Sequence, residues 1–124
     1  MTFQPGERFS AEAAVDLSAK QYHFVKLDSN GKLVLASAAT DNILGVLANA
    51  PKLGQIGDVV LLNGAGSFKV KTAAANIAKD AYITSDANGQ AVATTTTGNR
   101  VAGRLPYAST ASEIAEYIKH NEKY

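Results

Sequence analysis

An internal repeat constrains the fold of this chain more than any other feature of the sequence. When the chain is displaced by 58 positions, so that Asp28 falls on Asp86, two segments superpose without a gap. The superposed pairs have matching character: Phe24 and Tyr82, Asn30 and Asn88, Gly31 and Gly89, Val34 and Val92, Gly45 and Gly103, Leu47 and Leu105. Asn-Gly pairs favour tight hairpin turns. Each copy is therefore predicted to form a strand, an Asp-x-Asn-Gly turn, a second strand, a loop and a third strand.

The segment between the two copies adds a further pair of predicted strands. Residues 59–72 contain two apolar runs around a Gly-rich turn at 63–66, and in the second run Phe68 and Val70 alternate with two lysines. This pattern predicts a hairpin. Together with the repeat, it indicates an all-β fold, a small β-barrel or β-sandwich built from pseudo-repeated hairpin units.

The two ends of the chain differ from this middle. Residues 1–16 lack a helical period and are interpreted as an extended N-terminal arm followed by an edge strand, while residues 17–108 form the predicted β core. In residues 109–124, Thr110 and Glu113 have the spacing of a capping box. Small and β-branched residues follow at helical spacing, and His120 would be a cation near the helix end. The sequence thus predicts a short C-terminal helix and tail.

Composition limits the classes of function. The 124 residues fit a single domain, which commonly has about 100 to 150 residues. The absence of cysteine excludes disulfides and thiolate metal sites. A net charge of +1 argues against a purely electrostatic nucleic-acid or membrane binder, and no apolar run approaches the length of a membrane span. We expect a protein made in the cytoplasm that binds neither nucleic acid nor membrane.

No motif in the sequence predicts catalysis or metal binding. Asp28 and Asp86 begin turns that carry oxygen ligands, but their Gly is the fourth residue rather than the sixth that an EF-hand loop needs. His23 and His120 are too few for a multi-histidine zinc site. The Gly-rich segment 64–67 lacks the spacing of a nucleophile elbow or a phosphate loop. The expectation is a protein that is not an enzyme, with no cofactor, no metal and no catalytic residue.

The order of these motifs resembles a known family over about residues 8–108. A Gly45-Val46 pair is followed by a Gly-x-Val-Val segment at 57–60 and a Gly turn that leads into Val70. This progression resembles the small head decoration, or capsid cement, proteins of tailed bacteriophages. The resemblance implies a β protein that binds the outer surface of the expanded phage head and stabilises it. It implies the major capsid protein as partner, a location in the virion, and a homo-oligomer, with a trimer favoured over a dimer.

The N-terminal arm is the candidate contact segment. Phe3, Pro5 and Phe9 are apolar groups on a loosely patterned stretch, and an extended arm can join the sheet edge of a neighbouring protein through main-chain hydrogen bonds. We expect these three residues to bind the partner, although a simply disordered terminus is the plain alternative. A small ligand-binding β-barrel is the alternative function, and the four Phe and five Tyr, which are spread widely, count against it.

Overall fold

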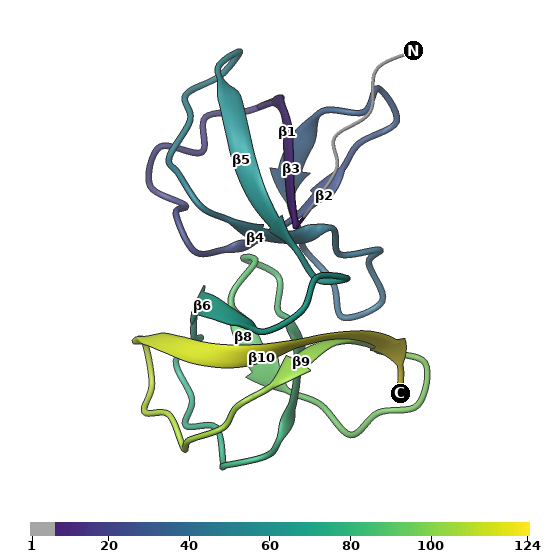
Figure 1. Ribbon diagram of the computed structural model, residues 1–124, viewed down its shortest axis with the longest axis vertical. Coiled ribbons are helices and arrows are strands. Elements are labelled where there is room, and N and C mark those ends of the chain that lie inside the picture. Colours follow the sequence, from purple (N-terminus) through teal and green to yellow (C-terminus); the bar gives the residue numbers. More distant parts are fainter. Residues whose placement is uncertain (1–6) are drawn as a thin grey trace.

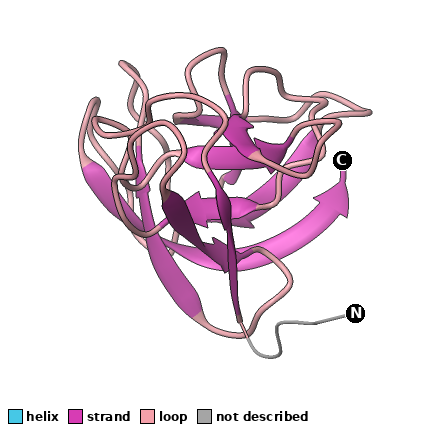
Figure 2. Ribbon diagram, turned by 90° about the horizontal axis from the view of Figure 1, so that it is seen from above, coloured by secondary structure: helices cyan, strands magenta, loops and turns pink. Residues whose placement is uncertain are grey.

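The computed structural model describes residues 7–124, which form ten strands and no helix (Figures 1 and 2). We call strands β1 to β5 the first unit and strands β6 to β10 the second unit. The strands of the first unit are β1 (Arg8–Glu12), β2 (Phe24–Leu27), β3 (Leu33–Leu35), β4 (Gly45–Leu47) and β5 (Ile56–Leu61). Those of the second unit are β6 (Ser67–Lys71), β7 (Tyr82–Ser85), β8 (Ala91–Ala93), β9 (Arg100–Arg104) and β10 (Ile114–Lys123).

The two units have the same topology, which confirms the repeat and the all-β fold class. Each unit is one five-stranded antiparallel sheet, with order β1-β5-β4-β2-β3 in the first and β6-β10-β9-β7-β8 in the second. The registers agree as well, because Phe24 pairs with Val46 and Tyr82 pairs with Arg104, 58 positions later. Figure 1 shows one sheet above the other. The repeat therefore extends beyond the segments that superpose in the sequence and covers all ten strands.

Neither sheet closes into a barrel. The two edge strands of the first sheet meet only through an isolated bridge between Ala13 and Leu33, and those of the second meet only between Thr72 and Ala91. A barrel needs a continuous ladder around its circumference. The architecture is thus compatible with a sandwich of two open sheets.

The predicted hairpin over residues 59–72 is wrong in its pairing. The strands β5 and β6 are present on either side of the turn, but β5 pairs with β1 and β4 whereas β6 pairs with β10. Alternating apolar residues indicate a strand without indicating its partner. In this chain, the Gly-rich turn links the two units instead of joining two strands of one sheet.

The predicted C-terminal helix is also wrong, because residues 114–123 form β10, the longest strand. Ala115 and Tyr117 are buried while their neighbours Ile114 and Glu116 are exposed, which is the two-residue period of a strand. Pairing with β6 on one side and β9 on the other outweighs the helical spacing of the small residues. The capping contacts do form, with the Thr110 N–H and hydroxyl both 3.0 Å from the Glu113 carboxylate, but they close a turn before a strand.

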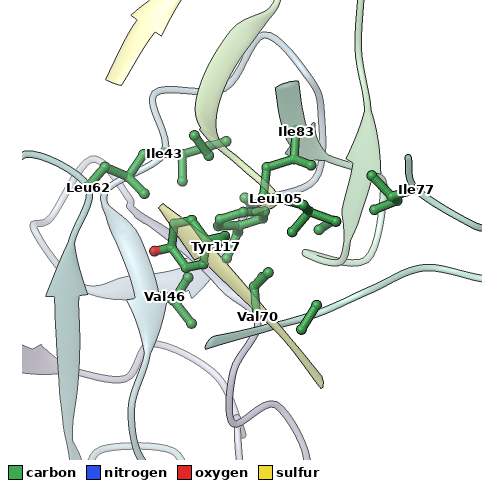
Figure 3. Packing of buried hydrophobic residues seen from close by; sticks show 13 residues of the cluster. Ile43, Val46, Leu62, Val70, Ile77, Ile83, Leu105 and Tyr117 are labelled. Carbon is green, nitrogen blue, oxygen red and sulfur yellow. The ribbon is translucent and has the colours of Figure 1, made fainter. Parts of the chain in front are cut away.

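The core has two parts. A cluster inside the first unit fills the space within its sheet, and its buried members are Ala13, Leu17, Val25, Leu33, Leu47 and Val59. A larger cluster lies within the second unit and between the units. In Figure 3, the Tyr117 ring lies between first-unit residues Ile43, Val46 and Leu62 and second-unit residues Ile77, Ile83 and Leu105. Both parts are packed with apolar side chains, and burial of this surface is the main force that holds the units together.

Candidate functional site

The structure places one of the three predicted contact residues. Phe3 and Pro5 lie outside the described residues. Phe9 lies on β1, is half-buried, and is paired with Val59 of β5 in its own sheet. The expected edge strand is therefore present, since β1 is at one edge of the first sheet. The role of the three residues in binding a partner stays a prediction.

The two Asp-x-Asn-Gly segments are turns with the same geometry. The Asp28 carboxylate accepts hydrogen bonds from the N–H groups of Asn30, at 2.8 Å, and Lys32, at 2.9 Å. The Asp86 carboxylate accepts the equivalent bonds from residues 88 and 90 at the same two distances. The bonds from Lys32 and Asn30 hold the pKa of Asp28 below its ordinary value. These carboxylates thus stabilise the two turns through hydrogen bonds to the backbone.

The two histidines lie in different units and different surroundings. His23 precedes β2 and is buried, which lowers its pKa, and its Nδ1 lies 3.1 Å from the carbonyl oxygen of Gln21. His120 is exposed on β10, with its Nε2 2.9 Å from the Glu122 carboxylate. Residues 7–124 contain no group of three His, Asp or Glu placed to hold a metal ion, and no helix that could span a membrane.

An exposed apolar patch lies at one end of the first unit. Val15 is 45% exposed, Leu53 67% and Ile56 58%. The segments that carry them are neighbours, because the Ala13 N–H donates to the Gln55 carbonyl at 2.8 Å and the Gly54 N–H donates to the Ala13 carbonyl at 3.0 Å. We call these three residues the apolar patch. Large apolar side chains gathered on a surface often mark a protein contact.

A second surface lies on the outer side of the second sheet and was missed by reasoning from the sequence. The Tyr82 ring stacks on His120, with centroids 6.5 Å apart, and meets Tyr124 edge-on at 6.1 Å. Arg104 pairs with Asp80 at 3.2 Å across the same hollow. His120 was assigned to a helix, so its position beside Tyr82 was not foreseen. When the 58-residue displacement is extended past Leu105, residues 114–119 superpose on the residues of β5. This superposition predicts a strand in place of the helix, and it would have revealed the position of His120.

Lys119 is a buried cation on the same strand. Only 2% of its side chain is exposed, and its Nζ lies 3.6 Å from the Glu7 carboxylate. The predicted helix over residues 109–124 would have placed this cation near the helix C-terminus. In the strand, the side chain of residue 119 instead points to the inner side, as those of residues 115 and 117 do.

Comparisons with known proteins give a clear likeness in the fold. No protein-family model matches the sequence, and no curated protein matches it. A solved structure that matches is the head fiber gp8.5 N base of bacteriophage phi29, with a TM-score of 0.72 and 17% sequence identity. The match covers 94% of this chain and 96% of that chain. This chain has the fold of a phage head fiber base, which agrees with the resemblance to phage head proteins in the sequence.

Proposed function

We propose that this chain is a structural protein of a phage head, and specifically a decoration or cement protein that binds the outer surface of the expanded capsid. The observation that carries the proposal is the fold it shares, over nearly the whole of both chains, with a protein described as a phage head fiber base. The sequence motifs supplied the same class independently. The partner proposed is the major capsid protein, the location is the virion, and no catalytic step is assigned to any residue.

The apolar patch is the described surface that we assign to the capsid contact, together with the predicted contact residues Phe3, Pro5 and Phe9. Leu53 and Ile56 are the most exposed members of the patch. A protein repeated over a closed shell gains from many weak contacts, so a patch of modest size is sufficient at each position. Burial of these side chains against the shell would contribute about 25 cal/mol for each Å² removed from water.

The alternative, a small ligand-binding barrel, has less support. Val25, Leu33 and Val59 are completely buried within the first sheet, so the interior is filled by the protein's own side chains. Ligand sites in small β-barrels lie inside the barrel or at its mouth. A ligand would have to bind on the outer surface of this protein.

Co-sedimentation with emptied, expanded heads of the source phage tests the function. We expect saturable binding that is absent with unexpanded shells. A protein that binds neither kind of shell is not a decoration protein, and a search for ligands of the outer surface would then be justified.

A matched pair of variants tests the contact surface in the same assay. Ile56 and Ile114 occupy equivalent positions at the starts of β5 and β10 and are 58% and 45% exposed. Ile56→Asp should weaken binding to expanded heads at least tenfold, whereas Ile114→Asp should leave it unchanged. Equal effects of the two substitutions would remove the patch from the proposal while leaving the function itself intact.

A further inference from the structure

The contact between the two units joins unlike faces. The first unit contributes what we call its leading face, where Phe24, Val46 and Leu62 are almost completely buried. The second unit contributes its receiving face, formed by β6, Tyr117 and the turn at Gly89. The rings of Phe24 and Tyr117 meet edge-on, and Tyr22 packs on Phe68 with centroids 6.0 Å apart.

Three backbone hydrogen bonds cross this contact. The Phe24 N–H donates to the Gly89 carbonyl at 2.7 Å, the Lys71 N–H donates to the Tyr22 carbonyl at 2.8 Å, and the Arg100 N–H donates to the Ala39 carbonyl at 2.7 Å. Buried main-chain bonds of this kind require close approach of the two backbones. At Gly89, an added Cβ would lie 2.8 Å from the Phe24 carbonyl oxygen, so the contact has no room for a side chain there.

Because the two units are equivalent, each chain has a second copy of both faces. The leading face of the second unit carries Tyr82, Arg104 and His120, at the positions of Phe24, Val46 and Leu62. The receiving face of the first unit has Phe9 at the position of Phe68 and Gly31 at the position of Gly89.

These second copies are open. Phe24 is fully buried but Tyr82 is 39% exposed, and Arg104 and His120 are exposed as well. Gly89 is buried, whereas Gly31 is exposed and an added Cβ there would meet no atom within 4 Å. Among residues 7–124, one leading face and one receiving face are therefore used within the chain. Of the second copies, Tyr82, Arg104, His120 and Gly31 are exposed, Phe9 is half-buried, and Val59, at the position of Tyr117, is buried in the core of its own unit.

The side chains of the free leading face are suited both to a protein contact and to exposure to water. Phe, Val and Leu of the first unit are replaced by Tyr, Arg and His. Tyrosine and arginine are enriched at protein interfaces because each combines a large contact area with a polar group. A permanently buried leading face needs no such polar groups, as the first unit shows.

We propose that the free leading face of one copy binds the free receiving face of a second copy of this chain, so that the contact within the chain is repeated between chains. Tyr82 would then meet the Gly31 turn of the second copy, and Phe9 of the second copy would lie near Asp80. Unlike faces form a head-to-tail contact, which closes into a ring or continues as a filament. The inference concerns association of the free protein and does not depend on capsid binding.

Sedimentation equilibrium of the full chain tests the proposal, in the absence of phage heads. The wild-type protein should have a mass of several copies. Tyr82→Asp removes the free leading face, and Gly31→Asn places a side chain where the backbones must approach. Asn tolerates the left-handed conformation of residue 31 (φ 74°), and the space there is open, so this variant should fold. Each variant alone should have the mass of a single chain.

The mass of a mixture of the two variants is the decisive measurement. Tyr82→Asp retains the free receiving face and Gly31→Asn retains the free leading face, so an equimolar mixture should form a species of two chains and no larger one. Gly66→Asn, also at a positive φ with open space, is the control and should keep the wild-type mass. A monomeric wild type, an oligomer unaffected by either substitution, or a mixture that stays monomeric would each overturn the proposal.

Discussion

The ring of Phe24 in the first unit meets the ring of Tyr117 in the second unit edge-on, with centroids 6.2 Å apart and planes at 76°. Edge-to-face pairs are favoured because the positive edge of one ring faces the negative face of the other. Both side chains are completely buried. The contact is thus a principal link between the two units.

Phe24→Ala should destabilise the whole protein by about 3 to 5 kcal/mol, because it removes a large side chain from a packed core. Chemical denaturation followed by tyrosine fluorescence measures the loss. Tyr82→Ala, at the equivalent but exposed position, is the control and should cost less than about 1 kcal/mol in the monomer. Similar losses at both positions would contradict the difference in burial.

Tyr117→Phe should be neutral or stabilising by about 1 kcal/mol near neutral pH, because the Tyr117 hydroxyl is buried without a hydrogen-bond partner. Burial raises the pKa of Tyr117 above its ordinary value of 10.0. The folded state therefore favours the neutral phenol, a contribution that is present below about pH 10 and is lost as the pH rises further. Thermal melts from pH 8 to 11 should show a steeper alkaline loss in the wild type than in Tyr117→Phe. Parallel curves would show that Tyr117 does not resist ionisation.

Gly45→Ala and Gly103→Ala should each destabilise the fold by about 3 kcal/mol through overpacking. An added Cβ would collide with the backbone carbonyl of Val60 in the first case and of Ile118 in the second. Gly31→Ala is the comparison, because within a single chain its cost comes only from the positive φ and should be about 1 kcal/mol. Urea denaturation gives all three values. A small effect at Gly45 with a large one at Gly103 would mean that the units are less alike than their backbones.

Asp28→Asn should lower the melting temperature at pH 7 and leave it unchanged in acid. The pKa of Asp28 is lowered by the hydrogen bonds from Lys32 and Asn30, so its charged form stabilises the fold. This contribution is present above the ordinary pKa of 3.8 and is lost as the pH falls through the lower, folded value. Melts at pH 7 and in strong acid, with Glu12→Gln as an exposed carboxylate outside the repeat turns, separate the turn effect from net charge.

The repeat allowed the strand content, the turns and the doubled architecture to be predicted, because turn residues and alternating apolar residues are local signals. The pairing of strands, by contrast, depends on residues that are far apart in the sequence. The turn at 63–66 looks like a hairpin turn although β5 and β6 belong to different sheets. At the C-terminus, a helical period fits Ala111, Ile114, Ala115 and Ile118, whereas the residues that are buried follow a period of two. Pairing of this segment with β6 and β9 decides in favour of the strand, and these partners are distant in the sequence.

The candidate surfaces were harder to predict, for a related reason. Whether Tyr82 is exposed depends on what packs against its sheet, and Phe24 in the same local sequence context is completely buried. Side chains at equivalent positions of a repeat therefore have different surroundings, and the sequence shows the difference only as a change from apolar to polar residues at three positions.

The doubled fold has a consequence for how the molecule comes apart. The Ala39 carbonyl accepts hydrogen bonds from both the Arg100 N–H and the Thr84 hydroxyl, and Phe24 and Val46 are completely buried in the cluster that the two units share. A half-chain cut at the linker would display an aliphatic and aromatic face to water and would aggregate rather than persist as a miniature domain. The two halves are thus expected to melt in one cooperative transition, which makes the pair, and not the repeat, the smallest autonomous piece of this protein.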